Sequence, residues 1–92
     1  MTKAELVTEL SIKTGFDKKT INIIVENFMK EVKENVANGE NVYLRGFGSF
    51  ITKTRAAKVA RNISRSVSIA VPAHKIPAFK PAKEFAQEVR KA

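Results

Sequence analysis

The sequence predicts an α+β fold in which helices fill the N-terminal half, a three-stranded antiparallel sheet carries a long β-ribbon arm, and a short helix ends the chain. Two patterns support this prediction. Apolar residues recur at every third or fourth position as far as Gly39, which is typical of amphipathic helices. After Gly39 apolar and polar residues alternate, which is typical of strands with one covered face. The 92 residues suffice for one small domain, which can bury little apolar surface by itself.

Two helices are expected in the first part of the chain. Thr2 and Glu5 have the spacing of a capping box, and Gly15 ends the helix that they begin. Asp17 is a suitable N-cap for a second helix, which stops at the Asn-Gly pair of residues 38–39. We interpret the apolar stripe of this second helix as core or as an interface between subunits. The stripe comprises Ile21, Ile24, Val25, Phe28, Val32 and Val36.

A β-hairpin is expected over residues 41–54, where the alternation is interrupted by a Gly-Phe-Gly turn. Alternation places Val42 and Leu44 on one face, and it places Tyr43 and Arg45 on the other. The apolar face of this hairpin is therefore expected to contribute to a core.

Two further alternating runs lie on either side of a polar tip at residues 62–65 and predict a long ribbon. Large apolar side chains are few in this ribbon and basic ones are many, so it cannot form a core by itself. We expect an arm that projects into solvent and becomes ordered on a ligand. After the arm, residues 76–79 return Phe79 to the body, and Pro81 is expected in the first turn of the last helix.

Charge is distributed unevenly along the chain. Residues 1–52 hold seven basic and seven acidic residues, whereas residues 53–92 hold ten and two and supply the whole formal net charge of +8. Between Asn41 and Lys83 there is no acidic residue. One-sided charge repels itself in a compact fold, so this pattern predicts a polyanionic partner, either nucleic acid or an anionic membrane surface.

The sequence gives less support to membrane binding and to a metal site. The basic residues follow alternating strands and not an amphipathic helix, and no apolar run is long enough to cross a bilayer. His74 is the only histidine and there is no cysteine, so we expect neither a metal nor a cofactor. A structural or solvent-exposed role is the expectation for His74.

RNA binding and catalysis are the remaining alternatives. A-form RNA presents a wide, shallow minor groove that suits a gripping ribbon poorly. The sequence shows no catalytic nucleophile with a matching general base and no phosphate-binding loop, which argues against an enzyme. A helix-turn-helix reader is disfavoured because Glu26, Glu31 and Glu34 would place carboxylates near phosphates.

Several short sequence motifs, referred to below as marks, occur together in one order along the whole chain. They are Gly46-Phe47-Gly48 followed by Phe50, the spaced Arg55, Lys58 and Arg61, the Arg61-Asn62 pair, Pro77 with Phe79, and Lys83 near the last helix. With these marks the chain resembles the HU and integration host factor family of bacterial architectural DNA-binding proteins.

The resemblance implies an intertwined dimer whose two β-ribbon arms hold the minor groove of double-stranded DNA and bend it with low sequence specificity. The partner chain is either an identical copy or a paralogue. A preference for bent, nicked or junction DNA and a place in the cytoplasmic nucleoid follow from the same resemblance. It also divides a single domain, residues 1–92, into a helical dimerisation part at 1–39, the sheet and arm at 40–81, and the C-terminal helix at 82–92.

The family's contacts can be carried over by position. The implied DNA-binding residues are Lys3, Lys53, Arg55, Lys58, Arg61, Asn62, Arg65, Lys75, Lys80 and Lys83. The implied dimer core consists of Phe28, Leu44, Phe47, Phe50 and Phe79.

Two positions at the arm tip depart from the family pattern. Ile63 stands where relatives commonly have the proline that enters a base step, and Ser66 stands where they usually have glycine. Isoleucine is among the apolar side chains that can separate stacked bases. Ile63 is therefore the predicted intercalating residue.

Overall fold

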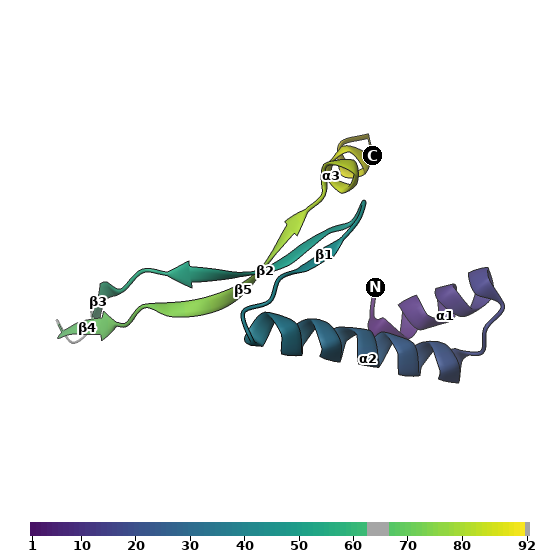
Figure 1. Cartoon of the computed structure of the whole chain (residues 1–92), viewed down its shortest axis with the longest axis horizontal. Coiled ribbons are helices and arrows are strands. Elements are labelled where there is room, and N and C mark those ends of the chain that lie inside the picture. The colour runs from purple at the N-terminus through teal and green to yellow at the C-terminus, as the bar shows by residue number, and fades with distance from the viewer. Residues whose placement is uncertain (63–66, 92) are drawn as a thin grey trace. The chain divides into compact units, whose positions relative to one another are not determined.

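The structure, a computed structural model, describes the backbone of residues 1–62 and 67–91 and the side chains of residues 1–57 and 70–91 (Figure 1). The order of helices and strands confirms the predicted α+β fold. The chain forms two compact units, Met1–Glu34 and Asn35–Ala92, which are described separately. The elements are α1 (Lys3–Thr14), α2 (Lys18–Ala37), β1 (Val42–Leu44), β2 (Gly48–Arg55), β3 (Lys58–Asn62), β4 (Val67–Val71), β5 (His74–Pro81) and α3 (Lys83–Lys91).

In the first unit, α1 and the start of α2 have the predicted caps. The Thr2 hydroxyl accepts a hydrogen bond from the Glu5 amide at 3.2 Å. Gly15 ends α1 in the left-handed conformation, with φ of 81°, and its amide donates to the Ser11 carbonyl. Before α2, the Asp17 carboxylate accepts from the Thr20 hydroxyl at 2.6 Å and from the Thr20 amide at 3.1 Å. These bonds lower the pKa of Asp17 because they favour its ionised form.

The C-terminal end of α2 is tied to the sheet within the second unit. The Gly39 amide donates to the Val36 carbonyl at 3.0 Å, and this carbonyl also accepts from the Thr52 hydroxyl on β2 at 2.9 Å. The Asn41 side-chain oxygen accepts from the Thr52 amide at 3.2 Å. Thr52 therefore positions the end of the helix against the middle of β2.

The sheet is antiparallel, with strand order β1-β2-β5. The predicted hairpin is confirmed by the pairing of Val42 with Phe50 and of Leu44 with Gly48. The placement of Pro81 in the last helix was wrong. Pro81 is the final residue of β5 and lies opposite Gly48, and α3 begins only at Lys83. Proline suits the end of a strand because the ladder requires no N–H from it there.

The arm is a direct continuation of β2 and β5. β3 and β4 pair antiparallel beyond the ends of those strands (Figure 1). The register is unchanged across the join, since Arg55 lies opposite His74 and Lys58 lies opposite Val71. The ladder is interrupted between these pairs, at residues 56–57 and 72–73, where Pro72 has no N–H to donate. The predicted ribbon is thus confirmed, as two ladders with one break.

Few apolar side chains are buried in the single chain. Among the described side chains, Val7, Ile21 and Val36 are the buried apolar ones. In the second unit four phenylalanine rings pack together, with centroids 5.0 to 6.4 Å apart, yet two of them remain more than a third exposed. The rings belong to Phe47, Phe50, Phe79 and Phe85.

Gly48 lies directly beneath this ring cluster. A Cβ atom at Gly48 would stand 2.6 Å from the Phe79 ring and 2.6 Å from the Lys80 carbonyl oxygen. We expect Gly48→Ala to lower the free energy of unfolding by about 1 to 3 kcal/mol, because the ring or the strand must shift. Urea denaturation measures this change in stability. Gly46→Ala is the matched control, because Gly46 also has a positive φ but has open space around it. Equal destabilisation in the two variants would contradict close packing over Gly48.

Candidate nucleic-acid interface

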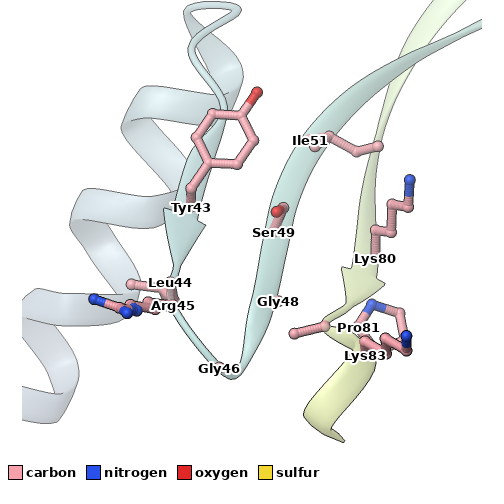
Figure 2. A pocket seen from close by; sticks show the side chains of 11 residues that line it. Tyr43, Leu44, Arg45, Gly46, Gly48, Ser49, Ile51, Lys80, Pro81 and Lys83 are labelled. Carbon is pink, nitrogen blue, oxygen red and sulfur yellow. The ribbon is translucent and has the colours of Figure 1, made fainter. Parts of the chain in front are cut away.

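The two faces of the sheet differ in chemistry. Tyr43 on β1 lies opposite Ser49 on β2, which in turn lies opposite Lys80 on β5, so the three form one row across the sheet (Figure 2). Since side chains on a strand alternate between faces, Lys53 and Arg55 lie on this same face further along β2. We call it the basic face. It carries three of the predicted DNA-binding residues and no carboxylate.

Lys75 lies on the opposite face of the ribbon. It pairs with Thr54, and alternation along β5 places it on the side of Phe79. Lys75 and Lys53 are both exposed, so both can meet solvent or a ligand. The structure therefore brings Lys53, Arg55 and Lys80 together on one face and separates Lys75 from them.

A hollow of about 550 Å³ opens where the β1–β2 turn meets the junction of β5 and α3. Arg45 lies on its β1 side, and Lys80 and Lys83 lie on its β5 and α3 side (Figure 2). The Ala82 amide donates to the Phe47 carbonyl at 2.9 Å and holds the two sides together. Lys83 is the first residue of α3, and the first amides of a helix have no acceptor within it. Three cations beside these amides make the hollow suitable for an anion such as a phosphate.

Comparison with known proteins identifies the family. The family model described as bacterial DNA-binding protein matches residues 1–90. The chain belongs to this family, that of HU and integration host factor. It is 40% identical to DNA-binding protein HU of Clostridium pasteurianum, over 99% of this chain and 100% of that protein. It is 36% identical to integration host factor subunit alpha of Actinobacillus pleuropneumoniae, over 97% and 91%.

A solved structure of the family has the same fold. Anabaena HU, in a cocrystal with DNA, superposes with a TM-score of 0.93 at 33% identity, covering 100% of both chains. The resemblance stated from the sequence marks is thereby confirmed.

The arm itself carries the remaining predicted contacts of this HU-family chain. Lys58, Arg61 and Asn62 lie on β3, and their side chains are outside the described ones. Ile63 and Arg65 lie outside the described residues. Their roles therefore stay predictions.

Lys3, predicted to contact DNA from the start of α1, has a partner within the first unit. Its ammonium group donates a hydrogen bond to the Glu26 carboxylate on α2. This bond and the charge of Lys3 lower the pKa of Glu26. A phosphate contact by Lys3 would replace this exposed ion pair, so its net contribution to binding would be reduced.

Sequence reasoning did not assign Arg45 or Tyr43 to the site. Both line the hollow, and Tyr43 also accepts a hydrogen bond from the Asn41 side chain at 3.2 Å. A signal for Arg45 was present, because Arg45 is the first basic residue of the acid-free run that ends at Lys83. The hollow that unites these two ends of the run depends on contacts between distant residues, which no local pattern reports.

Proposed function

We propose that this protein is an architectural DNA-binding protein that holds double-stranded DNA in the minor groove and bends it, with low sequence specificity. The observation that carries the proposal is the two-stranded arm of β3 and β4, which extends a basic face with no carboxylate. β-ribbons are among the elements that proteins place in the major or minor groove of DNA, and arginine suits the negative potential of a narrow minor groove. Membership of the HU family and the likeness to Anabaena HU in its DNA cocrystal support the same function.

We propose further that the working form is a dimer, of identical chains or of this chain with a paralogue. Phe28 is 45% exposed, Phe47 44% and Phe79 39% in the single chain, although all three are large apolar rings. Phe47 and Phe79 belong to one ring cluster, and a contiguous exposed apolar patch marks a surface that another protein covers. Leu44 and Phe50, the other two proposed core residues, are half-buried. An intertwined second copy would cover these side chains and present a second arm.

In this proposal DNA contacts extend from the arms to the body. Phosphates beside the bend would occupy the hollow between Arg45, Lys80 and Lys83, where cations and helix amides meet. Ile63 would enter a base step and open a kink, as apolar wedges do in minor-groove architectural proteins. DNA that is already bent, nicked or branched would cost less to deform and would bind more tightly.

The proposed role is structural and not catalytic, with residues 1–92 acting as one DNA-binding domain in the nucleoid of the cytoplasm. No cofactor takes part in it. Among the helices of the described ranges, none is both long and apolar enough to cross a membrane.

Bending of a short duplex tests the proposed function. The duplex carries a donor fluorophore at one end and an acceptor at the other, so energy transfer rises when the ends approach. We expect transfer to rise on saturation with the protein. Tight binding with unchanged transfer would contradict the architectural role, and absence of binding would contradict the proposal as a whole.

Salt dependence tests the hollow as a phosphate site. Lys83→Ala should flatten the plot of log K against log salt by about 0.9 for each B-DNA phosphate that the protein ceases to neutralise, because each neutralised phosphate releases counterions. Affinity should fall by a similar factor on unrelated DNA sequences. Lys91→Ala, in the last turn of the same helix, is the matched control and should leave the slope unchanged. A slope that Lys83→Ala does not alter would mean that Lys83 is merely solvated.

A further inference from the structure

His74 lies at the break between the two ladders of the arm, on the basic face. It is the first residue of β5 and lies opposite Arg55, and its side chain is exposed. Lys53 is its diagonal neighbour on the same face of β2, and Lys75 follows it on the other face. The sequence places no carboxylate between Asn41 and Lys83, so the charged groups of β2 that face His74 are cations.

A contact with the backbone at the break fixes the orientation of the imidazole ring. The Nδ1 atom of His74 lies 3.0 Å from the Pro72 carbonyl oxygen. A carbonyl oxygen can only accept, so Nδ1 must carry the proton that is donated in this bond. In the neutral ring Nε2 then has a lone pair and cannot donate to an anion. Protonation adds both an N–H at Nε2 and a positive charge.

The cations around His74 couple this protonation to a ligand. Arg55 lies opposite His74 in the ladder, so a phosphate held by the Arg55 guanidinium would lie next to the imidazole ring. A protonated ring would add a second charge-assisted hydrogen bond to that phosphate, whereas a neutral ring would not. Binding of a polyanion should therefore be accompanied by uptake of a proton.

We propose that His74 is a protonation-dependent phosphate ligand at the base of the arm, so that the affinity for DNA is higher when the imidazole is protonated. This proposal rests on the proposed DNA-binding function and adds a residue and a mode of regulation to it. Histidine is suited to the role because its charge changes between about pH 5 and pH 8.

The test compares duplex DNA affinity at about pH 6 and about pH 8, at constant ionic strength, for the full-length protein and two variants. The unsubstituted protein should bind about two- to fivefold more tightly at the lower pH for each arm that engages DNA, as for an exposed ion pair. Its salt slope should steepen by about 0.9 per additional phosphate bound. His74→Gln should abolish the contribution of His74 to the gain in affinity at lower pH and to the steeper salt slope. His74→Lys, which keeps a cation at either pH, should bind tightly at both.

Calorimetry provides a second measurement of the same coupling. In two buffers of different ionisation enthalpy, the unsubstituted protein should take up protons on binding DNA near neutral pH, and His74→Gln should take up fewer. Equal pH dependence and equal proton uptake in the unsubstituted protein and His74→Gln would overturn the role of His74 and leave the proposed DNA binding intact. No binding at either pH would instead contradict the proposed function.

Discussion

Replacing Phe79 by alanine should cost about 3 to 5 kcal/mol of unfolding free energy, the usual cost for a large aromatic side chain in a packed core. The Phe79 ring lies 5.0 Å from Phe50 and 5.3 Å from Phe47, centroid to centroid, at the centre of the ring cluster. In the single chain it is 39% exposed, so an effect of this size requires that a second subunit cover it. Denaturant unfolding at several protein concentrations measures both the effect and its link to dimerisation.

Tyr43→Ala is the matched aromatic control. Tyr43 belongs to the same sheet but lies on the basic face and is 72% exposed. Its truncation should cost less than about 1 kcal/mol, as is usual for exposed positions. Sedimentation of the unsubstituted protein completes the test, because a stably folded monomer at low micromolar concentration would contradict the proposed dimer core.

Ile63→Ser should strongly reduce DNA bending while reducing affinity for already kinked DNA only slightly. An apolar wedge costs a few kcal/mol in unstacking at one base step, which is offset by the extra surface that kinked DNA contacts. Serine would remove the proposed wedge, whereas the proposed phosphate ligands Arg61 and Arg65 would remain. The end-to-end energy transfer of a short duplex measures bending, and titration of kinked DNA measures affinity.

Ser64→Ala, at the next position of the tip, is a control that removes no apolar wedge. It should bend duplex DNA as the unsubstituted protein does. If Ile63→Ser bends intact linear duplex undiminished, the intercalating role of Ile63 is wrong, and the bend must come from charge neutralisation along the arm and body.

Local signals in the sequence predicted most of the fold. The caps at Thr2 and Asp17 and the stop at Gly15 involve residues within a few positions of one another, so their patterns are complete in the sequence. The hairpin faces were also predicted: Leu44 is half-buried, and Tyr43 is exposed on the other face. These predictions succeeded because the periods of helices and strands are local properties.

The wrong placement of Pro81 and the contacts that were not predicted arose where distant segments decide the structure. Proline suits the first turn of a helix and the end of a strand equally well, and only the pairing with Gly48 places Pro81 in β5. The bonds from Thr52 to Val36 and Asn41 join residues more than ten positions apart. No periodic signal marks such bonds.

The candidate site was predicted in composition better than in geometry. The acid-free run from Asn41 to Lys83 identified the basic residues as a set. Which of them share a face depends on the register of β2 and β5, which brings Lys53 and Lys80 to one side and Lys75 to the other. The break at Pro72 and the contact of His74 with its carbonyl likewise emerge only from the paired ribbon.

A comparison of the affinities for different nucleic acids is the measurement that tests the central claim most directly. The protein is titrated against four-way-junction or nicked DNA, intact linear duplex DNA and duplex RNA at one salt concentration, because affinities for nucleic acids depend steeply on salt. An arm that grips the minor groove and bends DNA should bind junction or nicked DNA most tightly, linear duplex less tightly and A-form RNA least. Equal or tighter binding to duplex RNA would contradict the claim that the arm recognises the minor groove of DNA.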